Sequence, residues 1–194
     1  MNKGGDQNRS VRNTKKKLRD ELLRLMQTKS VNEITAKELA ELADVNRGTF
    51  YFHYSDIYDL LHSIEDDFFA QLEQMLNAVP PPEGSALDYL TTIFTFIGQN
   101  PELCRVMLGP NGDMQFVSRV KRLVERRCSF FWRCMGPDAK PVGDALYSAF
   151  IVDGCIGLVT TWLEDGLRES PEEISQMVAR IVLNSAAPCL GRES

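Results

Sequence analysis

Apolar residues recur at spacings of three and four along almost the whole chain, which is the pattern of amphipathic helices. No stretch alternates apolar and polar residues over the length of a strand. The only clear linker is "AVPPPEGS" (78–85), where prolines and a glycine interrupt the periodicity. The pattern predicts an all-α protein of about nine helices, over residues 10–29, 36–43, 47–53, 56–77, 86–99, 101–108, 113–135, 141–167 and 171–188.

Capping residues mark the starts of three of these helices. Thr35 with Glu38 three residues later forms a predicted capping box. Asn46 is a residue type that caps helices, and it stands directly before the shortest predicted helix. Ser170 and Pro171 combine an N-cap with a proline at the first helical position. These capping residues locate the first residue of each helix more precisely than the apolar periodicity does.

A capped helix, a turn of about three residues and a short capped helix form a predicted helix-turn-helix, whose second helix would enter the major groove of DNA. That helix lies in "NRGTFYFHY" (46–54) and is aromatic on two sides. We expect Phe50 and Tyr54 to face inward, and Arg47 and Phe52 to face outward. An arginine can bind guanine through two hydrogen bonds, and a phenylalanine can contact a thymine methyl group. The alternative is a helical hairpin with an aromatic seam and no nucleic-acid partner.

Charge is unevenly distributed along the chain, whose net charge is −5. Residues 1–20 carry seven basic and two acidic side chains, whereas residues 61–194 carry 11 basic and 18 acidic ones. A charge run taken alone is more often a solvated surface. A basic segment that leads into a helix-turn-helix is suited to DNA phosphates, however, so the distribution favours double-stranded DNA as a partner.

The composition, 43% apolar and 25% charged, is that of a soluble globular protein. Five cysteines without a CxxC pair indicate reduced thiols, and the polar N-terminus lacks the apolar segment of a secretory signal, so we expect a cytoplasmic protein. Residues 145–163 are about as long as a membrane span, but Asp153 lies at their centre, so we expect a buried helix and no membrane partner. Asp153 would bind a cation, pair with Arg105 or Arg133, or face solvent.

The residues "ITAKELAELADVNRGTFYFHYSDIYDLL" (34–61) resemble the signature of TetR-type transcriptional regulators, and the resemblance extends over about residues 10–62. It implies a helix-turn-helix DNA-binding domain (1–60) followed by a helical effector-binding and dimerisation domain (61–194). It also implies a regulator, by default a repressor, that binds a palindromic operator as a homodimer and is released by a small molecule. The alternative is a helical ligand- or protein-binding module with weakened DNA binding.

Together with the pattern of the short helix, the resemblance implies a set of residues that contact bases or phosphates. They are Arg12, Lys16, Lys17, Thr35, Lys37, Asn46, Arg47, Gly48, Thr49, Tyr51, Phe52 and His53. Members of the family usually carry a phosphate-binding lysine at the position of Ile57, beside Asp56. We therefore expect Ile57 to point away from the core, and a lysine at this position to tighten DNA binding without changing stability.

Aromatic and sulfur-containing side chains cluster in the helices after residue 85, and core packing is the alternative explanation for each of them. Those expected to line an effector pocket are Phe94, Met107, Phe131, Tyr147, Phe150 and Trp162. Because few charges accompany them, we expect an apolar or aromatic effector. The predicted helices over 141–167 and 171–188 are the expected dimer seam. The small residues of "GCIG" (154–157) suit close approach of helices in that seam, and suit internal packing equally well.

Signals of catalysis are missing from the sequence. No GxSxG, HExxH or P-loop is present, and the only two histidines, His53 and His62, lie near the predicted DNA-binding end. The spacing of the cysteines does not suggest a metal site. The sequence therefore predicts a protein that is not an enzyme and that needs neither cofactor nor metal.

Overall fold

The computed structural model describes residues 3–78, 86–135 and 144–186. Within these ranges the chain forms nine α-helices and one short 3₁₀ helix, and no strand. The helices are α1 (Lys3–Met26), α2 (Ala36–Leu42), α3 (Arg47–His53), α4 (Ile57–Ala78), α5 (Ala86–Gln99), α6 (Pro101–Leu108), α7 (Met114–Met135), α8 (Asp144–Glu164) and α9 (Pro171–Ala186), with the 3₁₀ helix at Val31–Glu33. The predicted all-α fold is confirmed.

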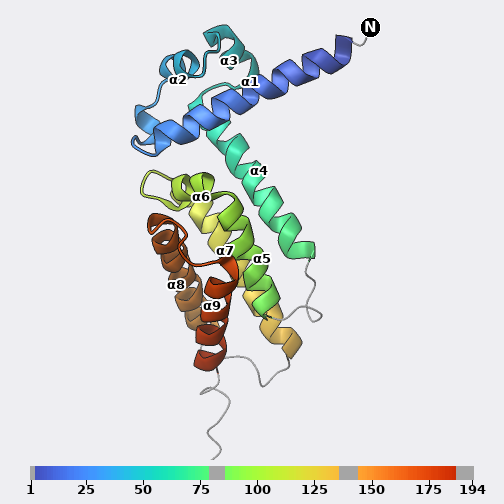
Figure 1. Ribbon diagram of the computed structural model, residues 1–194, viewed down its shortest axis with the longest axis vertical. Coiled ribbons are helices and arrows are strands. Elements are labelled where there is room, and N and C mark those ends of the chain that lie inside the picture. The colour runs from blue at the N-terminus through green and yellow to red at the C-terminus, as the bar shows by residue number, and fades with distance from the viewer. Residues whose placement is uncertain (1–2, 79–85, 136–143, 187–194) are drawn as a thin grey trace, which may run out of the picture.

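The molecule is elongated, with α1, α2 and α3 at one end and the bundle of α5 to α9 at the other (Figure 1). Helix α4 leaves the first group and runs along the side of the bundle. It contacts α1 at its start and α5 further along. We call α1 to α3 the reading head and α5 to α9 the body. One long helix, α4, joins the two.

The predicted caps are formed in the structure. The Thr35 hydroxyl accepts a hydrogen bond from the backbone N–H of Glu38 at 3.1 Å. The Asn46 side chain accepts one from Gly48 at 2.7 Å. At the start of α9, the Ser170 N–H donates to the Glu173 carboxylate at 2.8 Å, and the Glu173 N–H donates to the Ser170 hydroxyl at 3.2 Å. Side-chain groups thus satisfy N–H groups that a helix start leaves without partners.

The ends of α1 and α8 differ from the sequence-based expectation, and α1 ends at Met26 rather than near residue 29. Helix α1 begins at Lys3 rather than near residue 10, because residues 3–9 contain no apolar side chain from which a period could be read. Helix α8 ends at Glu164 rather than near residue 167. The backbone turns left-handed there, with φ angles of 81° at Gly166 and 57° at Leu167.

A continuous apolar core runs from the reading head into the body. In the head, Leu18, Leu39 and Phe50 have no exposed surface. The same cluster of contacts extends along α4 to residues of α9 such as Val178. A hydrogen bond of 3.1 Å from the Asn111 side chain to a backbone carbonyl in α1 adds a polar link between head and body. Because α4 spans residues 60 and 61, the predicted domain boundary falls inside one helix and stays a prediction.

Helix α8 is long and apolar enough to cross a membrane, judged by length and composition only, and one such helix is weak evidence for a membrane span. The expectation that it is buried is wrong for the single chain, since only 33% of its apolar window is buried. Leu146 is 82% exposed and Phe150 is 70% exposed. Periodicity shows that a helix has an apolar face but not whether the same chain covers that face.

Asp153 lies on the surface of α8, where its side chain is 60% exposed and lies 2.6 Å from the Nζ atom of Lys121. It therefore faces solvent, one of the three expected possibilities. The expected pairing with Arg105 does not occur, because the Arg105 guanidinium donates instead to the Leu163 carbonyl at 3.2 and 3.0 Å. The side chain of Arg133 lies outside the described residues.

Candidate nucleic-acid interface

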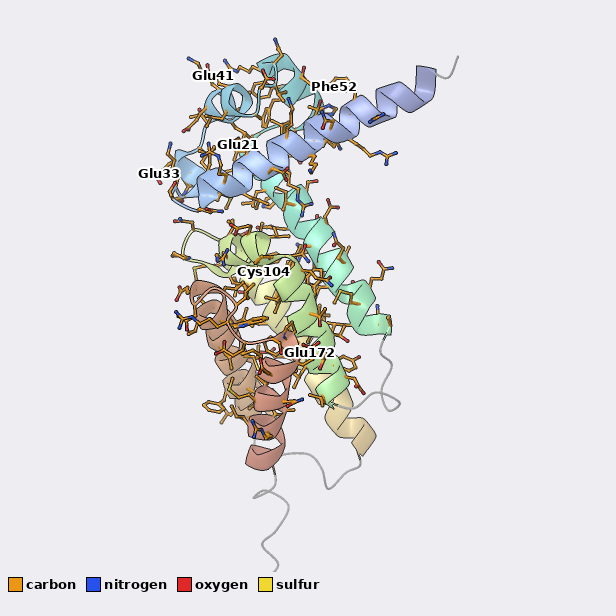
Figure 2. The ribbon with its side chains drawn as sticks, in the orientation of Figure 1. Glu21, Glu33, Glu41, Phe52, Cys104 and Glu172 are labelled. Atoms are coloured by element: carbon orange, nitrogen blue, oxygen red, sulfur yellow. The ribbon has the colours of Figure 1, made fainter. Side chains whose placement is uncertain are left out.

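Helix α3 separates its aromatic side chains between the core and the surface, as the sequence predicts. Phe50 is fully buried, and Tyr54 at the end of α3 is 7% exposed. On the other side, Tyr51 is 48% exposed and Phe52 is 81% exposed. The labelled Phe52 in Figure 2 lies in the reading head, at the end of the molecule far from Glu172 of the body. The exposed face of α3 is thus free to meet a large partner.

Arg47 stacks on Tyr51 at the outer face of α3. The centre of its guanidinium lies 5.4 Å from the centroid of the Tyr51 ring, and one of its nitrogens lies 3.5 Å from the Tyr51 hydroxyl. These two residues are one helical turn apart, so their side chains meet on the same face. The stacking limits the freedom of the arginine and presents its remaining donors outward.

All three lysines of the predicted contact set lie in exposed ion pairs. Nitrogen–oxygen distances are 3.4 Å for Lys17 with Asp44 and 3.9 Å for Lys37 with Glu41. Lys16 pairs with Asp20, also at 3.9 Å. Exposed pairs of this kind contribute only about 0–1 kcal/mol, so phosphates can replace the carboxylates at small cost. The acids nevertheless place negative charge beside the candidate interface.

Several predicted contact residues have structural roles in the turn. The side chains of Thr35 and Asn46 cap α2 and α3. A Cβ atom at Gly48 would lie 3.1 Å from the Asn46 side-chain oxygen, so glycine at this position lets the cap close. Thr49 is half-buried beside them, and Arg12 is exposed on α1. The sequence assigned the two caps correctly but did not reveal this reason for the glycine.

Burial lowers the pKa of His53, and the nearby Lys15 lowers it further. The shift favours the neutral ring, which can donate a hydrogen bond but carries no charge. The predicted set omits Lys15, although its Nζ atom lies 5.6 Å from the centroid of the Tyr54 ring, between α1 and the end of α3. Its place in the run Lys15-Lys16-Lys17 is the sequence signal that could have revealed it.

The side chain of Ile57, at the start of α4, does not lie where the sequence analysis expects it. It is only 6% exposed and belongs to the apolar core rather than pointing away from it. The helix is capped at this point by Asp56, whose carboxylate accepts from the Asp59 N–H at 2.8 Å. The first helical residue after this cap turns inward, so the expectation that Ile57 points away from the core is wrong. We therefore expect a lysine here to lower stability.

The five predicted pocket residues whose side chains the structure describes divide into three groups. Phe94, Met107 and Trp162 are at most 3% exposed, and the rings of Phe94 and Trp162 meet edge to face with centroids 5.8 Å apart. Tyr147 is half-buried and donates a hydrogen bond from its hydroxyl to a backbone carbonyl of α9 at 2.8 Å. Phe150 is on the surface of the single chain, so it lines no interior space there. The side chain of Phe131 lies outside the described residues.

The fold and the candidate interface define a helix-turn-helix protein with a helical C-terminal body. Residues 18–64 match the model described as "Bacterial regulatory proteins, tetR family", and residues 84–184 match the model described as "Transcriptional regulator C-terminal region". The chain belongs to the TetR family of transcriptional regulators. Regulators of this family bind DNA and small-molecule effectors and form dimers, and they are typically cytoplasmic. The family assignment points to a regulator rather than to an enzyme.

The chain is similar to an uncharacterised HTH-type transcriptional regulator, YxbF, of Bacillus subtilis (strain 168), with 22% identity over 177 residues. The match covers 85% of this chain but only 43% of the length of that protein. Among solved structures, a TetR-family regulatory protein from Rhodococcus RHA1 is 18% identical with a TM-score of 0.69, over 93% of this chain and 98% of that one.

A second similar structure is the regulator FadR from Bacillus subtilis in complex with stearoyl-CoA. It is 14% identical with a TM-score of 0.63, over 86% of this chain and 96% of that one. At such identities the two structures show a shared fold and nothing more specific.

Proposed function

We propose that this TetR-family protein is a repressor that binds a palindromic DNA operator as a homodimer and is released by a small molecule. The observation that carries the proposal is the exposed face of α3, where Arg47, Tyr51 and Phe52 point away from a core held by Phe50. A guanidinium and two aromatic side chains on a short capped helix offer donors for base edges and phosphates and an apolar contact for thymine methyl groups.

In this proposal the DNA-binding domain extends to about residue 60, and the rest of the chain binds the effector and forms the dimer. Support for the dimer comes from an exposed apolar stripe on α8 and α9. Leu146, Phe150 and Ile181 are 82%, 70% and 52% exposed. Such a stripe is costly in water, and a second copy of the chain would cover it while matching the two-fold symmetry of a palindrome.

The proposed effector is an apolar or aromatic molecule that binds in the body. Support comes from the buried cluster around Phe94, Met107 and Trp162. A ligand releases the DNA only if it binds better to the conformation with low DNA affinity, so the expected response is a shift between two arrangements of the head. Long-chain acyl-CoA belongs in the test panel because the similarly folded FadR is described with stearoyl-CoA.

Binding of fluorescent DNA, with the operator first selected from random sequences, tests the proposal. Arg47→Ala is expected to weaken binding to the selected site by about 1–3 kcal/mol and to relax the preference at one base position. Tyr51→Phe is the matched control on the same face. It removes one hydroxyl, keeps the ring on which Arg47 stacks, and is expected to weaken all sequences about equally.

A salt series with the same DNA measures the basic contacts. The salt slope is the slope of the logarithm of DNA affinity against the logarithm of salt concentration. Substitution of Lys16 or Lys17 by alanine is expected to reduce its magnitude by about one for each phosphate contact removed. If the wild-type protein selects no DNA sequence, or if Arg47→Ala leaves both affinity and preference unchanged, the repressor proposal is wrong. The chain would then be a helical ligand- or protein-binding module.

A further inference from the structure

A buried carboxylate lies where α4 meets the body. Glu65 of α4 is 2% exposed, although glutamate is rarely buried without a partner. Its Oε1 atom is one of two buried side-chain polar atoms, among the described residues, that have no hydrogen-bond partner; the other is the Ser148 hydroxyl. An unpartnered buried carboxylate costs several kcal/mol, so this position needs an explanation beyond packing.

Two further metal-binding side chains lie beside Glu65. His62 is one helical turn earlier on α4, and Asp113 stands directly before α7. One ligand atom from each of the three residues lies within 4.8 Å of the other two. The Asp113 carboxylate is held in place because it accepts a hydrogen bond from the Gln115 N–H at 2.8 Å, as the cap of α7. The three residues therefore connect two helices that are far apart in the sequence.

The surrounding charges do not neutralise this cluster. Arg119 offsets the raised pKa of Glu65 only in part, and its guanidinium is engaged with Asp66 at 2.9 Å and lies over the ring of Phe69. Burial raises the pKa of Glu65 to about 7, and the Asp113 carboxylate adds to the shift. Two carboxylates at this separation repel each other when both are ionised, and a bound cation removes that repulsion.

The donor set selects the class of cation. One imidazole nitrogen and two carboxylate oxygens suit Zn²⁺, Co²⁺ or Ni²⁺, whereas Mg²⁺ and Ca²⁺ prefer oxygen ligands alone. Tetrahedral Zn²⁺ with bonds of about 2.0–2.2 Å needs ligand atoms about 3.3–3.6 Å apart, so the side chains must close by about 1 Å. His62 is exposed and can turn to do so, and its exposure leaves the fourth coordination position open to water.

We propose that His62, Glu65 and Asp113 bind a zinc-type divalent metal ion between α4 and the start of α7. Helix α4 carries the reading head, and α7 belongs to the body. The metal would therefore fix the position of the head relative to the body and make DNA affinity depend on the metal. This last consequence rests on the proposed DNA-binding function, whereas metal binding itself does not.

The test begins with full-length protein freed of metal by chelator and titrated with Co²⁺ and Zn²⁺. The expected results are one Co²⁺ bound per chain, with the visible spectrum of a nitrogen- and oxygen-ligated ion, its displacement by Zn²⁺, and a higher melting temperature with Zn²⁺. Glu65→Gln, His62→Gln and Asp113→Asn are each expected to weaken metal binding by about tenfold or more. His53→Gln, which changes the other histidine, is the matched control and is expected to bind the metal normally.

Glu65→Gln keeps the result interpretable because it preserves the side-chain shape and removes a buried charge. The metal-free variant is expected to melt no lower than the metal-free parent. A thiolate-to-cobalt charge-transfer band would place the ion on cysteines and overturn the proposal. Undiminished binding by Glu65→Gln, or no binding by the parent, would also overturn it. If the metal binds as expected but the protein selects no DNA, the site stands and the repressor proposal fails.

Discussion

The family resemblance implies a lysine facing phosphate at position 57, but the Ile57 side chain packs in the core with 6% of its surface exposed. Ile57→Lys is therefore expected to destabilise the protein by about 2–4 kcal/mol, because a buried apolar side chain is replaced by a charged one. The lysine stem can carry the ammonium group toward solvent, which keeps the loss below that of a fully buried charge. Urea unfolding followed by circular dichroism measures the change.

Ile57→Val is the matched control for this position. It keeps the apolar contact, removes one methyl group, and is expected to cost about 0.5–1.5 kcal/mol. If Ile57→Lys unfolds at the same urea concentration as the parent and binds DNA more tightly, the side chain faces phosphate in solution and not the core.

At the scale of the element, the sequence predicts helix starts well where a side chain caps the backbone. Local sequence alone predicts Thr35, Asn46 and Ser170 as caps, and each forms the predicted hydrogen bond. The reason is that a cap and its N–H partner are only two or three residues apart. The cluster of Glu65 and Asp113 could not be predicted in this way, because packing of distant helices brings these residues together.

The turn between α2 and α3 contains Asp44 in a left-handed conformation, with φ of 52°. Its carboxylate also pairs with Lys17. Asp44→Gly relieves the backbone strain but makes the unfolded chain more flexible, so stability is expected to change by less than about 1 kcal/mol. Removal of the acid frees Lys17, so DNA affinity is expected to rise and the salt slope to steepen by up to about one.

Asp44→Asn separates the effect of charge from that of the backbone. Asparagine tolerates the left-handed conformation as aspartate does but is neutral. It is expected to reproduce the tighter DNA binding of Asp44→Gly in a fluorescence anisotropy titration. Unchanged affinity in both variants would mean that Lys17 and Asp44 lie away from the phosphates.

At the scale of the whole molecule, the sequence identified α8 as apolar but not what covers it. In the single chain two exposed glycines of α8 lie beside the stripe of α8 and α9, and a Cβ atom at Gly154 or Gly157 would meet no other atom within 4 Å. Glycine inside a helix is unfavourable by about 1 kcal/mol relative to alanine. Packing within the single chain therefore does not explain why glycine occupies these two positions. Close approach of a second copy of the chain would explain it, because a larger side chain would then be in the way.

The dimer proposed from this stripe is tested by two substitutions that the single chain would tolerate. Phe150 is 70% exposed, so Phe150→Glu leaves the core of one chain unchanged but places a charge in the proposed dimer interface. Gly157→Gln adds a side chain that blocks the close approach of a second helix, and it raises the helix propensity of α8. Each is expected to raise the dimer dissociation constant by about tenfold or more, measured by sedimentation velocity over a concentration series. Met114→Glu is the control, because Met114 is 83% exposed on α7 and outside the stripe. A parent protein that sediments as a monomer at micromolar concentration, or a Phe150→Glu dimer as tight as the Met114→Glu dimer, would exclude this face as the seam.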